Sequence, residues 1–212
     1  MAFGPTSSGK TYTIFGSNDL NDGLVGYSLH DLYAAMNAQG SDKYRVEVSF
    51  YCIENERIFD LFQDYQPKMN VVNDPLEGLI VECSRTLEVN SKEHAFEIIK
   101  KGLAKIEDLN KQGVSMDFSH KILVFKIHTN SPDEEGYYFR GKCVFCDLAG
   151  SERKKRNGLT SVNPSIHILT SLLMGKGKEP LTAADSRVSQ VIRDCIPPNS
   201  RTYFIATVAP IM

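Results

Sequence analysis

A glycine-rich segment near the start of the chain has the composition of a phosphate-binding loop. It reads Gly4-Pro5-Thr6-Ser7-Ser8-Gly9-Lys10-Thr11, the pattern G-x-x-x-x-G-K-T. Glycines let the backbone curl so that successive N–H groups face a phosphate, and a following helix adds the positive end of its dipole. The lysine of this pattern reaches the β- and γ-phosphates, and the threonine hydroxyl binds Mg²⁺. We therefore predict a site for ATP or ADP, with Lys10 on an exposed part of the loop.

A second segment supplies the other half of such a site. The apolar residues 144–146 end in Asp147, and Gly150 follows in the pattern D-x-x-G. A carboxylate at a strand tip can hold Mg²⁺ through water, and the Gly150 N–H can reach a γ-phosphate. The sequence thus predicts Mg²⁺ held by Thr11 and, through water, by Asp147.

Composition limits the classes of protein to which the chain can belong. Its 212 residues favour one domain, and 24 basic against 26 acidic residues exclude binding to nucleic acid through bulk positive charge. The longest apolar runs, such as residues 122–125, are far shorter than the ~20 residues that cross a bilayer. No signal peptide is recognisable, and the five cysteines are scattered. We expect an intracellular domain, in the cytoplasm, without a nucleic-acid or membrane partner.

The spacing of apolar residues predicts the elements that position these segments. Helical spacing covers residues 24–37, a stretch after Ser91 as N-cap, and segments near 165–174 and 185–195. Strand-like composition covers residues 44–53, 79–81, 86–89, 121–128, 138–146 and 202–208. No repeat or linker divides the chain, so the mixed order predicts a single three-layer α/β domain.

Several motifs resemble one family. Residues 147–153, Asp-Leu-Ala-Gly-Ser-Glu-Arg, resemble the switch II signature of the kinesin motor domain. Further matches follow in the family's order: the phosphate loop with Tyr12-Thr13, Asn55-Glu56-Arg57-Ile58-Phe59-Asp60-Leu61, Val162-Asn163-Pro164-Ser165-Ile166, Asp185-Ser186-Arg187, Asn199-Ser200-Arg201-Thr202 and Thr207-Val208-Ala209-Pro210. The chain is therefore identified as a member of this family from motifs spread over almost its whole length.

The resemblance implies a fold and a set of site residues. The fold would be a kinesin-type P-loop NTPase, α/β, with a mixed, mostly parallel central sheet and helices on both faces. Residues 4–11 and Tyr12 would bind the nucleotide, with Tyr12 as the candidate for stacking on the base. Gly150, Glu152 and Ser119 would be the catalytic candidates.

The chain also departs from the family at both ends. Kinesin motor domains carry strands before the phosphate loop and a helix after the final strand, and neither is found in residues 1–212. We interpret the chain as a single truncated motor-like domain. In the family the missing strands pair beside the final strand, so residues 202–208 would form an exposed apolar sheet edge. We expect a partner chain to cover Tyr203–Val208.

Switch I is the most altered motif. The family pattern N-x-x-S-S-R-S-H aligns with residues 113–120, where only Ser119 and His120 are kept. Phe118 stands where the family has the arginine that would pair with Glu152. Losing one preorganised transition-state contact costs ~10²–10³ in rate, so the resemblance implies a phosphate cradle without hydrolysis. In an alternative alignment Ser115 serves as the first serine.

The microtubule side is weakened as well. The segment from residue 153 to 162 is shorter than the family's loop, although basic residues persist there. The candidate microtubule contacts are Lys154, Lys155, Arg156, Lys176, Lys178 and Arg187.

Three functions remain open at this stage. The first is a hydrolysis-deficient structural or scaffold component of a microtubule assembly such as a ciliary axoneme. The second is an active ATP-driven motor completed by sequence or a chain not included here. A small-molecule kinase is the third, and Asp-Leu-Ala-Gly-Ser-Glu disfavours it.

Overall fold

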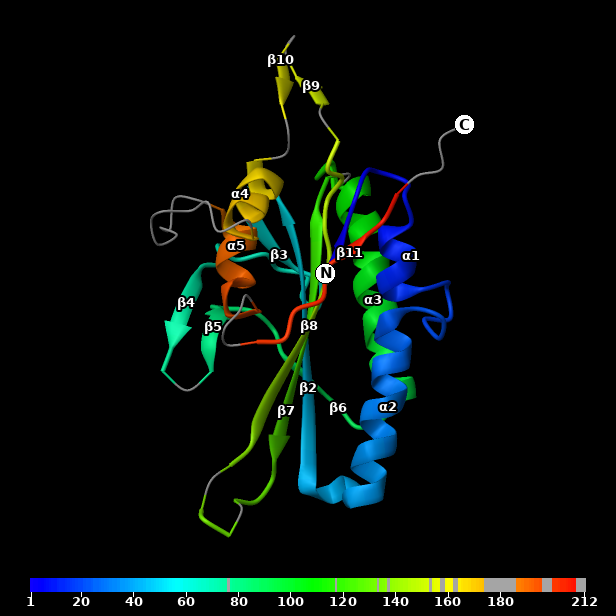
Figure 1. Cartoon of the computed structure of the whole chain (residues 1–212), viewed down its shortest axis with the longest axis vertical. Helices are drawn as coiled ribbons and strands as arrows, with labels where there is room; N and C mark the ends of the chain where they lie inside the picture. The colour runs from blue at the N-terminus through cyan, green and yellow to red at the C-terminus, as the bar shows by residue number, and fades with distance from the viewer. Residues whose placement is uncertain are drawn as a thin grey trace.

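A mixed β-sheet runs through the centre of the protein, and helices cover both of its faces (Figure 1). The sheet order is β11-β1-β8-β7-β2-β3, and β6 also pairs with β2. The computed structural model describes residues 1–75, 77–116, 118–132, 134–136, 138–152, 154–156, 159–161, 164–173, 186–195 and 200–208. The strands of the sheet are β1 (Ala2–Phe3), β2 (Tyr44–Glu54), β3 (Arg57–Asp60), β6 (Leu87–Val89), β7 (His120–Thr129), β8 (Arg140–Asp147) and β11 (Ile205–Ala206).

The direction of pairing changes across the sheet. Parallel pairs join β1 to β11 and to β8. Antiparallel pairs join β8 to β7, β7 to β2, and β2 to both β3 and β6. The sheet is mixed, as the family resemblance implies, and β11 stands at its edge.

The helices divide between the two faces (Figure 1). One face carries α1 (Lys10–Phe15), α2 (Leu24–Gln39) and α3 (Lys92–Lys111); the other carries α4 (Pro164–Leu173) and α5 (Arg187–Val191). Two short 3₁₀ helices, η1 (Ser41–Lys43) and η2 (Arg193–Cys195), complete the helical part. No helix in the described part of the chain is long and apolar enough to cross a bilayer.

Strand β7 shows how the sheet separates two apolar cores. Successive side chains of a strand point to opposite faces. Leu123 and Phe125 accordingly pack in the cluster beneath α1, α2 and α3, whereas Ile122 and Val124 pack in the cluster beneath α4 and α5. All four are at most 5% exposed. This strand is therefore buried on both faces along its central part.

A two-residue turn joins β2 to β3 and also anchors two helices. Asn55 and Glu56 both have positive φ, 49° and 60°, as tight hairpin turns of this length require. The Glu56 carboxylate accepts hydrogen bonds from the Ser165 hydroxyl, at 2.7 Å, and from the backbone N–H of Arg187. The turn thereby fixes the beginnings of α4 and α5 against the end of β2.

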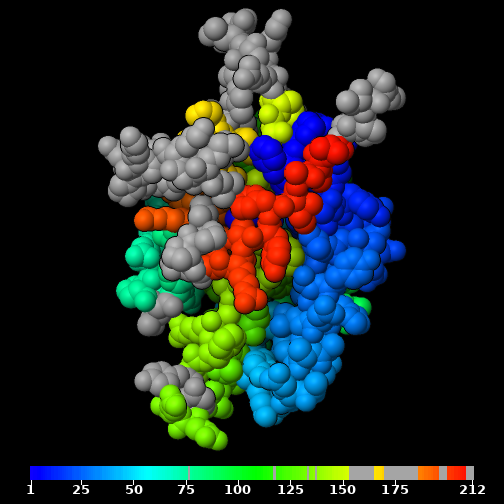
Figure 2. All heavy atoms as spheres, viewed as in Figure 1, coloured from blue at the N-terminus to red at the C-terminus, as the bar shows by residue number. Residues whose placement is uncertain are grey.

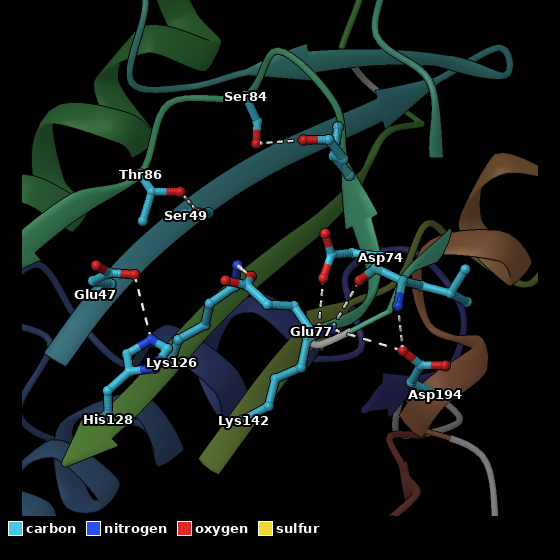
Figure 3. Close-up of polar contacts among 12 residues, drawn as sticks. Glu47, Ser49, Asp74, Glu77, Ser84, Thr86, Lys126, His128, Lys142 and Asp194 are labelled. Carbon is cyan, nitrogen blue, oxygen red and sulfur yellow. Dashed lines mark hydrogen bonds and ion pairs between the residues drawn. The ribbon is translucent and has the colours of Figure 1, made fainter. Parts of the chain in front are cut away.

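Two small hairpins lie outside the main sheet. One consists of β4 (Val71–Asp74) and β5 (Gly78–Val81), and the other of β9 (Lys154–Arg156) and β10 (Leu159–Ser161). The β4–β5 hairpin is tied to the sheet by polar contacts, which include an ion pair between Lys126 and Glu77 (Figure 3). The β9–β10 pair stands clear of the sheet at the top of Figure 1.

Sequence-predicted elements differ from the structure mainly near the C-terminal end. Helix α5 has five residues and is followed by η2, where one helix over 185–195 is predicted. The strand predicted over 202–208 is also reduced, to the two residues of β11. Its partner β1 is only two residues long, so the ladder is limited to bonds such as Ile205 N–H to Met1 O at 2.9 Å.

Candidate functional site

The loop from Gly4 to Gly9 connects β1 to α1 and closes on itself. The Ser8 backbone N–H and hydroxyl both donate to the Pro5 carbonyl, at 3.3 and 2.7 Å. Gly9 has φ +94°, a left-handed conformation that glycine adopts at little cost, and α1 begins at the next residue. The first helical hydrogen bond runs from the Thr13 N–H to the Gly9 carbonyl, at 2.8 Å. The structure thus forms the curled loop that the glycine spacing predicts.

Lys10 points back into this loop. Its ammonium donates to the Pro5 carbonyl at 2.6 Å, and the residue is only 8% exposed. Burial lowers the pKa of the Lys10 ammonium, while Asp147 and Glu152 act in the opposite direction. The prediction of an exposed Lys10 is wrong because the side chain folds under the loop instead of projecting from it.

The two halves of the predicted site meet at Asp147. Its backbone pairs with Ala2 of β1, which brings the end of β8 beside the start of the loop. The Thr11 hydroxyl donates to Asp147 Oδ2 at 2.6 Å. Asp147 is 1% exposed. The structure therefore brings Thr11 and Asp147 together, as their places in the two motifs predict.

Lys121 is a site residue that the sequence reading treats only as part of a strand. It faces Asp147 directly in the antiparallel β7–β8 ladder. Its ammonium donates to Asp147 Oδ2 at 2.8 Å, the same oxygen that accepts the Thr11 hydroxyl. The signal in the sequence is that Lys121 directly precedes an apolar run, residues 122–125. A charged side chain in that position needs a buried partner.

The segment after β8 packs onto the loop. The Ser151 N–H donates to the Gly4 carbonyl at 3.0 Å. Thr6 donates twice to the Glu152 carboxylate, through its N–H at 2.9 Å and through its hydroxyl. A Cβ added at Gly150 would lie 2.4 Å from Thr6 Oγ1, so any larger residue would displace the side chains of Thr6 and Glu152. Gly150 and Glu152 therefore lie directly against the loop.

This arrangement agrees with the comparisons with known proteins. A model of the kinesin motor domain matches residues 1–212. The chain belongs to the kinesin motor domain family. It is 29% identical to Kinesin-like protein KIN-8B of Arabidopsis thaliana over 99% of this chain and 28% of that protein. It is 27% identical to Kinesin-like protein 3 of Schizosaccharomyces pombe over 99% of this chain and 40% of that protein.

Solved structures confirm the predicted fold. The structure of a fast kinesin superposes with a TM-score of 0.84 at 24% identity, covering 98% of this chain and 63% of that one. The motor and motor homology domain of Kar3Vik1 gives a TM-score of 0.80 at 22% identity, covering 98% and 57%. The chain thus spans less than half the length of the two curated relatives named above and less than two thirds of these solved chains.

The described part of switch I in this kinesin-family chain forms a local turn around Ser119. Ser119 is the switch I serine that the resemblance marks as a catalytic candidate. Its hydroxyl donates to the Met116 carbonyl at 2.8 Å, and the residue is buried. Phe118 is 39% exposed, and Asp117 lies outside the described residues. The Ser119 N–H donates to the same carbonyl at 3.2 Å, so both bonds belong to a local turn.

His120 joins switch I to switch II. Its Nδ1 accepts a hydrogen bond from the Ala149 N–H at 3.2 Å. Burial lowers the pKa of His120 from 6.5 to about 4, so the imidazole is neutral at physiological pH. In the tautomer that this bond requires, Nε2 carries the proton, and it has no hydrogen-bond partner among the residues that the structure describes.

The oxygens of Thr11 and Asp147 suit a hard cation, but the negative charge of Asp147 is already balanced by a lysine. Hydroxyl and carboxylate oxygens are the ligands that Mg²⁺ prefers. The carboxylate, however, is already bound by the Lys121 ammonium. Among the described residues no group of three or more His, Cys, Asp or Glu side chains could hold a metal ion. As it stands, the site does not fit a divalent cation.

The remaining predicted residues lie at the surface or outside the described chain. Tyr12 is 58% exposed on α1, and its hydroxyl donates to Asp22 Oδ2 at 3.1 Å. Lys154, Lys155 and Arg156 form β9, whereas Lys176 and Lys178 lie outside the described residues.

Arg187 begins α5 and is half-buried. Its guanidinium donates to Gln190 Oε1 at 3.1 Å and to Asn70 Oδ1 at 3.3 Å. These bonds hold the Arg187 side chain against the protein's own surface.

Proposed function

We propose that this chain is a kinesin-like, microtubule-associated domain that binds ATP or ADP but hydrolyses ATP very slowly. Its role would be structural, as a scaffold component of a microtubule assembly. The observation that carries the proposal is the contrast between the two halves of the site. The phosphate loop and Asp147 are assembled, whereas the Ser119 hydroxyl is bonded to Met116.

Nucleotide binding is supported by the loop. Lys10 lies within it, and the Thr11 hydroxyl and Asp147 meet at its end. Mg²⁺ at Thr11 and Asp147, as the motifs predict, would require Lys121 to release the carboxylate.

Titration with a fluorescent ADP analogue tests this site. We expect Lys10→Met to abolish binding, because it removes the ammonium charge. The fold should persist, because methionine keeps most of the buried stem. Lys101→Met, on the exposed surface of α3, is the matched control and should bind like the unmodified chain. Equal affinity in both variants would contradict the proposal.

Slow hydrolysis is supported by the placement of Glu152. Its carboxylate accepts both hydrogen bonds from Thr6. Phe118, which cannot form an ion pair with Glu152, stands at the position of the family's switch I arginine. A closed site needs donors aimed at the charge that develops in the transition state.

Phosphate release in the presence of microtubules measures this rate. We expect a rate far below the usual enzyme range of about 1–10³ s⁻¹. A microtubule-stimulated rate within that range would overturn the proposal and favour an active motor.

Microtubule association is proposed through the basic strand β9. Lys154, Lys155 and Arg156 are consecutive and lie on the hairpin that stands clear of the sheet (Figure 1). Reversing all three to Glu should weaken co-sedimentation with microtubules by roughly tenfold or more at low salt, because charged rims steer and hold acidic partners. The same reversal at Lys100, Lys101 and Lys111 of α3 is the control. Equal loss in both variants would point to net charge rather than to β9.

A partner chain is proposed for the edge strand. Tyr203, Phe204 and Val208 are 75%, 41% and 80% exposed, and they flank or adjoin β11 at the sheet edge. Figure 2 shows residues 200–208 on the surface that faces the viewer. Apolar side chains gathered at an unpaired edge favour association. A measurement of mass in solution tests this, and a stable monomer at high concentration would refute it.

The proposed location is the cytoplasm, on the microtubule cytoskeleton, with the ciliary axoneme as one such assembly. Imaging of a fluorescently tagged chain in ciliated cells is the test. Signal that persists when microtubules are depolymerised would contradict a microtubule location.

A further inference from the structure

Two donors of the site converge on one carboxylate oxygen of Asp147. The Thr11 hydroxyl and the Lys121 ammonium both donate to Asp147 Oδ2, at 2.6 and 2.8 Å. The two bonds come from different elements, since Thr11 lies on α1 and Lys121 on β7. In the pattern G-x-x-x-x-G-K-T the threonine hydroxyl is a ligand of Mg²⁺. The ammonium therefore lies where a cation shared by the threonine and the aspartate would be expected.

From this geometry we propose that Lys121 takes the place of the divalent cation, so that the phosphate loop binds a nucleoside di- or triphosphate without requiring a metal ion. The inference rests on the proposed nucleotide binding and specifies how that binding is achieved. An ammonium supplies one positive charge and hydrogen-bond donors for phosphate oxygens. Lys10 supplies a second from within the loop.

The Lys121–Asp147 pair is built into the sheet. The two residues are directly opposite each other in the β7–β8 ladder, so the backbone brings their side chains together. Their side chains are 20% and 2% exposed. A buried lysine rarely lacks a partner, and removing it would leave the Asp147 carboxylate uncompensated. The ammonium is therefore a fixed part of the site.

Charge also opposes the simultaneous presence of a metal ion. A divalent cation bound to Asp147 Oδ2 would lie beside the Lys121 ammonium, and like charges at such distances repel strongly in a buried site. No further cluster of acidic ligands exists among the described residues to offset that repulsion. The effect of Lys121 on its surroundings extends to the loop, because its charge contributes to the lowered pKa of Lys10.

The test compares the affinity for a fluorescent ADP analogue in excess Mg²⁺ and in EDTA. We expect the full chain to give nearly the same dissociation constant in both. We expect Lys121→Ser to bind at least ~10-fold more weakly in EDTA than in Mg²⁺, because a buried carboxylate without its cation is costly. Lys126→Ser is the matched control: this lysine lies on the same strand and is 18% exposed, but it pairs with Glu77 away from the loop. It should behave like the unmodified chain.

The outcomes separate this inference from the function on which it rests. If the unmodified chain binds the analogue only with Mg²⁺, the inference is overturned and nucleotide binding stands. If the unmodified chain binds it in neither condition, the proposed nucleotide site fails and the inference fails with it. If Lys121→Ser does not fold, Lys121→Arg, which keeps the positive charge, is measured instead. Binding that depends on Mg²⁺ in both Lys121→Arg and the unmodified chain would also overturn the proposal.

Discussion

Strand β7 carries two partly buried lysines, one beside the phosphate loop and one further along, and their positive charges are balanced in different ways. At the loop end, Lys121 faces Asp147 across the β7–β8 ladder, so opposite charges meet within the sheet. Further along, Lys126 faces Lys142, so like charges meet. The lysines Lys121 and Lys126 are buried to a similar degree, with side chains 20% and 18% exposed. The burial of the lysine is therefore not what distinguishes a candidate site from a structural contact.

The partners make the difference. The charges of Lys126 and Lys142 are balanced from outside the sheet, because Lys126 pairs with Glu77 of the β4–β5 turn and Lys142 pairs with Asp194 at 4.0 Å (Figure 3). Lys142 also donates to the Leu79 carbonyl at 2.9 Å. Asp194 completes this region by accepting the Leu79 N–H at 2.6 Å. At that end the charges attach a hairpin to the sheet, whereas at the loop end they bring an ammonium to the same carboxylate oxygen as Thr11 of the phosphate loop.

The largest expected effect comes from removing the buried acid. Asp147→Ala leaves the partly buried Lys121 ammonium without its counter-charge, which should cost about 3 kcal/mol of unfolding free energy. Glu77→Ala removes a partly exposed acid, 32% exposed, and should cost at most about 1 kcal/mol. Denaturant unfolding of both variants measures the contrast. Adding Lys121→Met to Asp147→Ala should recover part of the loss, and equal costs at the two ends would break the comparison.

The two regions of β7 should lose folding stability in different pH ranges as the solution is acidified. Burial gives His120, next to Lys121, a folded-state pKa of about 4, below its ordinary 6.5. As pH falls from 6.5 to about 4, the unfolded chain gains a proton that the folded one does not, so stability falls by on the order of 3 kcal/mol.

The hydrogen bond from Lys126 lowers the pKa of Glu77 below its ordinary 4.5, so its contribution is lost only as pH falls below that value. His120→Asn, which retains an acceptor for the Ala149 N–H, should remove the higher window alone. Unfolding curves measured across pH test this, and an unchanged slope between pH 6.5 and 4 in the variant would contradict it.

The smallest effect is expected at Lys126. Lys126→Met breaks the pair with Glu77 but also relieves the repulsion from Lys142 across the ladder. We expect a change within about 0.5 kcal/mol, less than that of Glu77→Gln. A double-mutant cycle of Lys126→Met and Lys142→Met separates the two terms. A favourable coupling between the lysines would show that their charges do not repel.

Local patterns in the sequence predict much of the fold. Ser91 does cap α3, accepting the His94 N–H at 3.1 Å, and the helical spacing of residues 24–37 lies within α2. These signals depend on neighbours a few residues away. The lengths of α5 and β11 are not predicted, because they are set by η2 and by the two-residue partner β1.

The same distinction applies to the site. The contact of Thr11 with Asp147 follows from two motifs whose chemistry requires each other. The role of Lys121 depends on which residue lies opposite it in another strand, and register between strands is not visible in one sequence. The burial of Lys10 is missed for a different reason: its ammonium bonds back to the Pro5 carbonyl of its own loop instead of projecting from it.

The pairing of β1 with β11 has a consequence for the order in which the protein is made. Thr207 donates to the Phe3 carbonyl across 204 residues of chain. At synthesis rates of roughly 5–20 residues per second, the segment that carries the phosphate loop waits on the order of 10–40 s for this partner. The β2, β7 and β8 ladder can close before then, because its strands are made earlier. The nucleotide loop is therefore the part of the domain that gains its full support last, when the edge strand leaves the ribosome.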